Sequence, residues 1–116
     1  MQRVMLKSKI HRATLTATDL HYEGSISIDK ILLDAADILP GEQVHVLNIN
    51  NGKRLITYAI EAPADSGTMM LNGPAARCGL PGDIVVVISF ANYDQSECVN
   101  LLPRVIHVDG NNRMKS

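Results

Sequence analysis

The sequence predicts a compact β-barrel with short helical connections, formed by a single domain. About seven short extended segments are separated by turns that contain glycine or proline, and only two short stretches are suited to helices. The chain has 116 residues, which is enough for one hydrophobic core and too few for two domains of ordinary size. We therefore expect residues 1–116 to fold as one unit.

The chain begins with extended segments. Residues 9–17 alternate in character, so that Lys9 and His11 fall on the same face of a strand. A second extended piece is expected over residues 19–24, where it ends at a glycine, and a third over residues 25–28. These segments are the predicted first strands of the barrel.

One helix is expected after the third strand. Asp29 is suited to accept hydrogen bonds from the free amides of a first helical turn, so it predicts a helix over about residues 30–38. Pro40 and Gly41 end this helix. Its apolar face follows the i, i+3, i+4, i+7 spacing at Leu32, Ala35, Ala36 and Leu39.

The clearest local signal is a hairpin. Residues 43–49 and 54–61 are strand-like and are joined through Asn51-Gly52, a dipeptide that tolerates the positive φ of a tight turn. The elements expected after it are a loop over 62–68, a strand over 69–72, a short helix over 73–77, a turn over 80–83, a strand over 84–90, a solvated loop over 94–97, a strand over 104–108 and a frayed tail over 110–116. The strand over 84–90 is apolar throughout, which is typical of a strand buried on both faces.

Composition and charge argue against several classes of function. The formal charge of −1 and the 3% of aromatic residues oppose a nucleic-acid-binding surface. No apolar run approaches the ~20 residues that span a bilayer, and Arg3 and Lys7 interrupt the segment where a signal peptide would be apolar. Cys78 and Cys98 form no CxxC motif. We expect a cytoplasmic protein with no metal and with neither a nucleic-acid nor a membrane partner.

The dipeptide Gly24-Ser25 is by itself an ordinary turn, but it lies within a larger pattern. Seven stretches in order along most of the chain make up this pattern: 9–12, 19–25, 33–36, 51–54, 57–60, 72–73 and 82–85. The His-Tyr-Glu-Gly-Ser run and the Asn-Gly-Lys-Arg hairpin are specific in combination. Together these stretches closely resemble the pyruvoyl-dependent aspartate 1-decarboxylases.

The resemblance implies a fold, an assembly and an activity. The expected fold is a six-stranded double-psi β-barrel with short helices. The expected assembly is a homotetramer whose active sites lie between neighbouring subunits. The expected activity is the decarboxylation of L-aspartate to β-alanine and CO₂, which supplies pantothenate and coenzyme A biosynthesis.

The resemblance also implies that the chain cleaves itself. The Ser25 hydroxyl would attack the carbonyl of Gly24, which has no Cβ to block the approach. The chain would separate into residues 1–24 (β chain) and 25–116 (α chain). Ser25 would become a pyruvoyl group that forms a Schiff base with the amine of the substrate. Neither a metal nor an external cofactor is then expected.

Thr57 and Tyr58 follow the hairpin, and by residue type alone they are an ordinary pair in a β-strand. The resemblance implies that Tyr58 donates the proton that follows decarboxylation. It places Thr57 at the processing site and in the substrate pocket, with its hydroxyl donating to the carbonyl of Gly24 as negative charge develops there.

Two cations are expected to bind the substrate. Arg54 shares a strand face with Tyr58, and its guanidinium suits a carboxylate. Because aspartate has two carboxylates, Arg54 and Lys9 are the expected anchors, although the sequence leaves open which binds which. By residue type alone, both are solvated charges on strands. His11 and Tyr22 are expected in supporting roles.

The other wall of the substrate pocket is expected to consist of Asn72, Gly73, Pro74 and Ala75. Pro74 departs from the family pattern, in which a residue with a free amide stands at this position. Ile26 and Leu47 also depart from that pattern, the first in place of a small residue or cysteine and the second in place of an aromatic residue. These two differences are expected to alter packing alone.

The sequence leaves two alternatives to this enzyme. One is a homologue that does not process itself, and the other is a small β-barrel binding module for nucleic acid or another ligand. The sequence also leaves open whether cleavage is autonomous or requires an accessory maturation factor.

Overall fold

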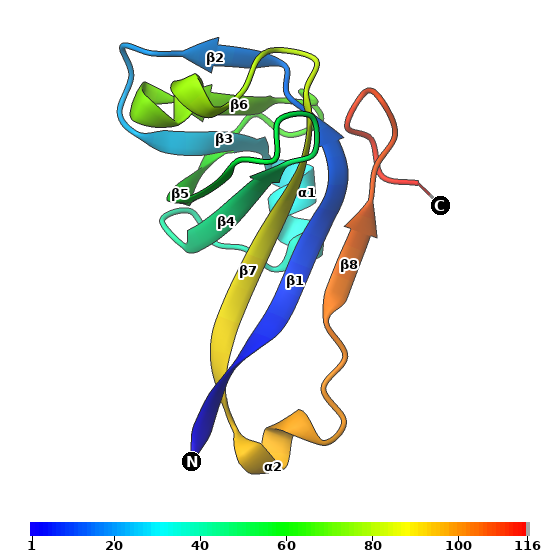
Figure 1. The fold of residues 1–116 in the computed structure, drawn as a ribbon. Helices are drawn as coiled ribbons and strands as arrows, with labels where there is room; N and C mark the ends of the chain where they lie inside the picture. Colours follow the sequence, from blue (N-terminus) through cyan, green and yellow to red (C-terminus); the bar gives the residue numbers. More distant parts are fainter. Residues whose placement is uncertain (116) are drawn as a thin grey trace.

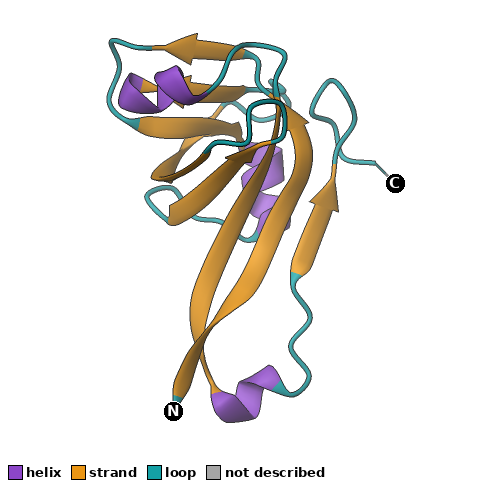
Figure 2. Cartoon of the chain, in the orientation of Figure 1, coloured by secondary structure: helices purple, strands orange, loops and turns teal. Residues whose placement is uncertain are grey.

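The computed structural model describes residues 1–115 and contains one eight-stranded sheet with short helical connections (Figures 1 and 2). The strands are β1 (Gln2–Thr14), β2 (Ala17–Asp19), β3 (Ser25–Asp29), β4 (Gln43–Asn48), β5 (Arg54–Ala62), β6 (Met69–Asn72), β7 (Ile84–Asp94) and β8 (Arg104–His107). Their order across the sheet is β2-β6-β3-β5-β4-β7-β1-β8. The mainly β class is confirmed, with eight strands in place of the expected six. The short strands β2 and β8 form the two edges.

The strands β1 and β7 form a long antiparallel ribbon that projects from the body of the molecule (Figure 1). Their register runs from Gln2↔Asp94 to Thr14↔Ile84. β1 begins well before the expected residue 9 because its N-terminal part pairs with the extension of β7 beyond Phe90. β8 lies parallel to β1 on the other side.

The structure contains the helices α1 (Lys30–Ala36) and α2 (Gln95–Cys98) and the 3-10 helix η1 (Gly73–Cys78). Among the described residues, no helix has both the length and the apolar character to cross a membrane. α2 occupies the expected solvated loop, because Asp94 and Glu97 form a reciprocal capping box there.

The expected N-cap of α1 is confirmed, since the Asp29 carboxylate accepts a hydrogen bond of 2.9 Å from Ile31 N. The helix ends at Asp37, whose φ of 56° is left-handed, and it therefore stops before the expected residue 38. For that reason Leu39 does not belong to the apolar face and is 68% exposed. Leu33 is buried in its place.

The hydrophobic core joins one face of the sheet to α1, which lies behind the strands in Figure 1. Its largest fully buried side chains are Ile10, Leu15, Ile26, Ile28, Leu32, Leu33, Met69, Leu71, Val44, Val46, Val85 and Val87. The expected burial on both faces is confirmed for Val85–Ser89, whereas at the two ends of the expected strand Ile84 is half-buried and Phe90 is exposed. This core fixes β3, β5 and β6 side by side.

The hairpin between β4 and β5 is confirmed, and in its turn Asn48 Oδ1 accepts a hydrogen bond of 2.8 Å from Asn50 N. The extended piece over 19–24 is wrong beyond β2. There the Asp19 carboxylate accepts a hydrogen bond of 3.1 Å from His21 N and turns the chain toward Ser25.

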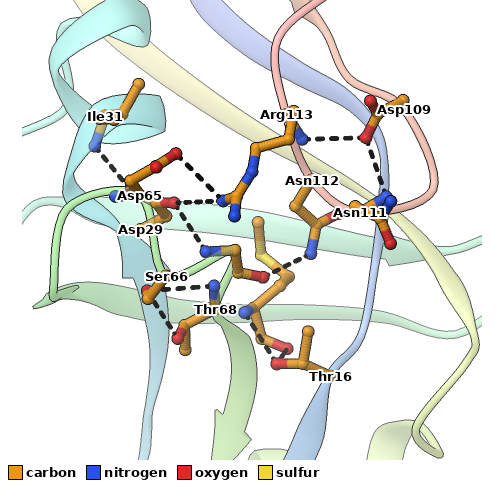
Figure 3. A network of polar contacts seen from close by, with 12 residues as sticks. Thr16, Asp29, Ile31, Asp65, Ser66, Thr68, Asp109, Asn111, Asn112 and Arg113 are labelled. Atoms are coloured by element: carbon orange, nitrogen blue, oxygen red, sulfur yellow. Dashed lines mark hydrogen bonds and ion pairs between the residues drawn. The ribbon is translucent and has the colours of Figure 1, made fainter.

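The prediction of a frayed C-terminal tail is wrong for residues 110–115, while residue 116 lies outside the described residues. Asn112 is only 1% exposed and forms hydrogen bonds of 2.8 Å with Thr14 and Gly67. Figure 3 shows Asn112 next to Arg113 in the polar network that joins this turn to Asp29 and Asp65. The Arg113 guanidinium lies 3.8 Å from the Asp29 carboxylate and 3.3 Å from that of Asp65. A polar turn thus closes over the end of β3 that is distant from Ser25.

Candidate functional site

Ser25 is the first residue of β3 and lies between β5 and β6. In the antiparallel pair with β6, Ser25 is opposite Asn72. In the parallel pair with β5, Ile26 is opposite Ala59. Tyr58 comes one residue before Ala59, as Ser25 comes one residue before Ile26, so the two residues lie at neighbouring positions of adjacent strands. The sheet therefore brings together three expected site residues from three separate stretches of sequence.

A buried hydrogen-bond network surrounds Ser25, and both Ser25 and Asn72 have 0% exposure. Asn72 Nδ2 donates to Ser25 Oγ and to Ser27 Oγ, each at 2.9 Å. Ser25 Oγ donates to the carbonyl of Glu23 at 3.1 Å. Within residues 1–115, Asn72 Oδ1 has no hydrogen-bond partner although it is buried. It is therefore free to accept a hydrogen bond from a group that appears at this position.

Gly73 permits a close approach between two loops at this site. Its φ is +62°, and a Cβ placed on it would lie 2.6 Å from Tyr22 O and 2.8 Å from Gly24 N. No other residue fits there without a shift of the backbone. The bond between Gly24 and Ser25 is therefore held against the start of η1.

Pro74 occupies the first turn of η1, where a missing amide is tolerated because these N–H groups have no partner within the helix. Its Cδ lies 3.4 Å from the position that a Cβ on Gly24 would take. The departure at Pro74 thus presents a rigid apolar ring to the residue before Ser25.

A cavity of about 340 Å³ opens beside the Gly24–Ser25 bond. It is lined by Gly24, Leu55, Ile56, Thr57, Pro74, Ala75 and Cys78. Gly24, Thr57, Pro74 and Ala75 were expected in this site, whereas Cys78 was not. Cys78 is the last residue of η1, and its only signal in the sequence was its place at the end of the short helix. Within residues 1–115, the Thr57 hydroxyl forms no hydrogen bond.

Lys9 and His11 do not reach this cavity within one chain. Both lie on β1, and the strands β5, β4 and β7 separate β1 from β3. The His11 ring packs edge-on against His107, with 5.4 Å between the ring centroids. Burial, the adjacent His107 and the nearby cations Lys9 and Arg12 lower the pKa of His11.

Arg54 and Tyr22 lie outside the lining of this cavity. Arg54 is the exposed first residue of β5, opposite Leu47 of β4. The outward face that it shares with Tyr58 includes Ile56, which is 60% exposed. Tyr22 lies in the loop before Ser25 and is 50% exposed. Some of the expected site residues therefore lie around Ser25 and its cavity, whereas Lys9, His11, Arg54 and Tyr22 lie outside the cavity lining.

The described residues include no group of three His, Cys, Asp or Glu side chains that could hold a metal ion. The available chemistry is that of a buried serine, an amide, two small loop residues and a phenol on the adjacent strand. This set suits chemistry at the backbone between Gly24 and Ser25.

Comparison with known proteins finds relatives that match this chain over nearly its whole length. A family model described as aspartate decarboxylase matches residues 1–115. The chain is 55% identical to the aspartate 1-decarboxylase of Syntrophobacter fumaroxidans over 97% of its own length and 91% of that protein. It is 58% identical to that of Thermoanaerobacter pseudethanolicus, with 97% of each chain covered. It is also 58% identical to aspartate 1-decarboxylase 1 of Gloeobacter violaceus, over 98% and 97% of the two chains.

Proposed function

The chain belongs to the aspartate decarboxylase family, and we propose that it converts L-aspartate to β-alanine and CO₂ with a pyruvoyl group made from its own Ser25. The observation that carries this proposal is the buried Ser25, hydrogen-bonded to Asn72 and joined to a glycine that is pressed against η1. A pyruvoyl ketone supplies an acceptor for the electrons left behind when CO₂ departs.

The residues around Ser25 fit such a group. Asn72 Oδ1 is a buried acceptor without a partner among residues 1–115, so it is available to groups that form at the head of β3. The backbone atoms around Gly73 leave no room for a side chain at this position next to Gly24. Asn72, Gly73 and Ala75 are thus the residues that would hold the group and the substrate next to it.

The atoms that react in the cleavage belong to Gly24, Ser25 and one water molecule. Ser25 Oγ forms a bond to the carbonyl carbon of Gly24 as the amide bond between the two residues breaks, and the proton of the hydroxyl passes to the freed nitrogen. Elimination then removes the Cα proton of residue 25 and breaks its Cβ–Oγ bond, so that Gly24 leaves as a carboxylate that keeps Oγ and residue 25 becomes dehydroalanine. Water replaces the nitrogen at Cα of residue 25, and ammonia leaves. The products are residues 1–24 and 25–116.

We assign the substrate contacts by charge and by position. Arg54 and Lys9 are cations suited to the two carboxylates of aspartate. Thr57 lines the cavity with Gly24 and is suited to donate to the Gly24 carbonyl as it gains negative charge. The Tyr58 hydroxyl donates a proton to the substrate carbon that has lost CO₂.

The division of the site residues supports an assembly in which chains share active sites. Because Lys9 and His11 lie three strands away from Ser25, they would serve a neighbouring chain. We propose a homotetramer with active sites between subunits, located in the cytoplasm and supplying β-alanine for pantothenate and coenzyme A.

The test is the mass of the purified, denatured protein before and after warming, followed by an assay of CO₂ release from aspartate. We expect two fragments that meet between Gly24 and Ser25, the larger one reactive toward a carbonyl reagent and without an α-amine at residue 25, so that an amine label modifies only its lysines. Ser25→Ala is expected to remain intact and inactive. Ser96→Ala, which removes an exposed hydroxyl on α2, is expected to behave like the wild type.

An intact wild-type chain would be warmed again with cell extract, because an accessory maturation factor would then restore cleavage. A chain that stays intact with extract contradicts the proposal. A cleaved chain that releases no CO₂ from aspartate contradicts the assigned reaction but not the processing.

A further inference from the structure

We propose that Ser27 is a positioning residue for the cleavage between Gly24 and Ser25, acting through the side chain of Asn72; this inference rests on the proposed function. Asn72 Nδ2 donates to Ser27 Oγ at 2.9 Å and to Ser25 Oγ at 2.9 Å. An amide nitrogen carries two hydrogens. The two hydrogens of the Asn72 amide NH₂ group are therefore donated one to Ser25, which reacts, and one to Ser27.

The strand geometry makes this arrangement specific. Ser25 and Ser27 are two residues apart on β3, so both side chains project from the same face. On the antiparallel strand β6, Asn72 lies opposite Ser25 and diagonal to Ser27. Ser27 is 5% exposed, and both partners are fully buried. Water therefore does not replace either hydrogen bond.

The hydrogen bonds to Ser25 and Ser27 are what orient the side-chain amide of Asn72. Within residues 1–115, Asn72 Oδ1 has no partner, so the orientation of the amide depends on the two serine hydroxyls. Without Ser27, one hydrogen bond to Ser25 remains and the amide is free to turn its nitrogen away. Ser27 thus keeps the Asn72 donor aligned on Ser25 Oγ.

This alignment bears directly on cleavage. The Ser25 hydroxyl donates its hydrogen to the Glu23 carbonyl and presents its oxygen to Asn72 Nδ2. As the oxygen gives up its proton and bonds to the carbonyl carbon of Gly24, the hydrogen bond from Asn72 holds it in the direction of attack. A misdirected amide slows this step and leaves the fold in place.

The test follows cleavage with time by intact mass in freshly purified Ser27→Ala and Ser27→Thr chains. Ser27→Ala is expected to slow cleavage about 5- to 10-fold, the effect of one lost hydrogen bond in the transition state. Ser27→Thr keeps the hydroxyl and is expected to stay within about twofold of the wild type. Unfolding midpoints are compared in a Ser25→Ala background, where every chain is intact and stability is measured separately from cleavage.

A double-mutant cycle identifies the route of the effect. If Ser27 acts through Asn72, Ser27→Ala causes no further slowing in an Asn72→Ala chain. Equal slowing in both backgrounds, or slowing that Ser27→Thr does not rescue, overturns the inference. An unchanged rate in Ser27→Ala also overturns it. A wild-type chain that never cleaves, even with cell extract, overturns the proposed function itself.

Discussion

Asn112 forms hydrogen bonds of 2.8 Å with both the backbone N–H and the backbone carbonyl of Thr14, a residue 98 positions earlier in the chain. The same side chain donates to the carbonyl of Gly67 at 2.8 Å. One buried amide thus joins the C-terminal turn to β1 and to the loop before β6. The hydrogen bond to Gly67 is buried, and those with the half-buried Thr14 are partly buried.

Asn112→Ala is therefore expected to lower the free energy of unfolding by about 2–4 kcal/mol, because two backbone groups of the half-buried Thr14 and one of the buried Gly67 lose their partner. Urea unfolding of intact chains carrying Ser25→Ala measures this change. The matched control is Asn111→Ala at the exposed neighbouring position, for which a change within about 0.5 kcal/mol is expected. Similar losses in both variants would show that the amide of residue 112 has no special role.

Gly73→Ala is expected to prevent cleavage and to destabilise the fold by more than about 3 kcal/mol, since its Cβ would meet the backbone of Tyr22 and Gly24. The control is Gly82→Ala. Gly82 also has a positive φ, but a Cβ there meets nothing within 4 Å. It is expected to cost only about 1–2 kcal/mol and to leave cleavage intact. Mass and urea unfolding separate the two effects, and equal behaviour of the variants contradicts the close approach at Gly73.

Glu42 forms a small ionic cluster beside the ribbon of β1 and β7. Its carboxylate accepts hydrogen bonds from Lys7 Nζ at 2.8 Å, from Ser89 Oγ, and from Leu39 N at 3.2 Å. Burial raises the pKa of Glu42, but the hydrogen bonds and the charge of Lys7 outweigh it and hold the pKa below its ordinary value of 4.5.

The stability contributed by Glu42 is therefore present above about pH 4.5 and is lost as the pH falls through its lower folded-state pKa. Glu42→Gln is expected to cost about 1–2 kcal/mol at pH 7, and the difference from wild type should shrink at pH 3. Urea unfolding at both values measures this change. A difference that stays constant between the two pH values would rule out the carboxylate charge as its source.

The sequence predicted local structure best where one residue type controls one turn. The cap at Asp29 and the start of η1 at Gly73 depend on nearby residues, and both are found in the structure. The C-terminal tail was mispredicted because its order depends on Thr14 and Gly67, which are distant in sequence. Polarity alone does not distinguish a solvated asparagine from a buried one.

The candidate site was also predictable from the sequence where its residues lie in short motifs, and not where they depend on long-range contacts. The motif around Ser25 and the loop at Asn72 indicated the residues that the sheet brings together. Ser27 was not found because a serine at alternate positions of a strand gives no sign of its partner on β6. The position of Lys9 away from Ser25 depends on strand order, which local patterns do not encode.

Tyr58→Phe is expected to leave cleavage intact and to lower kcat for aspartate by about 100- to 10,000-fold, because it removes only the phenolic proton. The measurement is CO₂ release from fully cleaved enzyme, with the cleaved fraction checked by mass. Tyr93→Phe on the projecting ribbon is the control and should retain wild-type turnover. Unchanged turnover in Tyr58→Phe would remove Tyr58 from the proton transfer.

The separation of Lys9 from Ser25 by three strands predicts that inactive chains complement one another. Lys9→Ala supplies an intact Ser25, and Ser25→Ala supplies an intact Lys9. Mixed oligomers formed by co-expression are expected to recover activity in about a quarter of their sites, because each site needs one intact contribution from each of two chains.

The control uses two inactive variants, Lys9→Ala and Tyr58→Phe, each co-expressed with wild-type chains. These mixtures measure how far dilution of the wild-type sites alone lowers the activity. Mixing the purified homo-oligomers without exchange of subunits should give no recovery. Recovery only after co-expression supports a shared site, since neither chain alone carries both groups. If co-expressed Lys9→Ala and Ser25→Ala chains stay inactive while forming mixed oligomers, Lys9 serves the site of its own chain and the sheet must bend to bring it there.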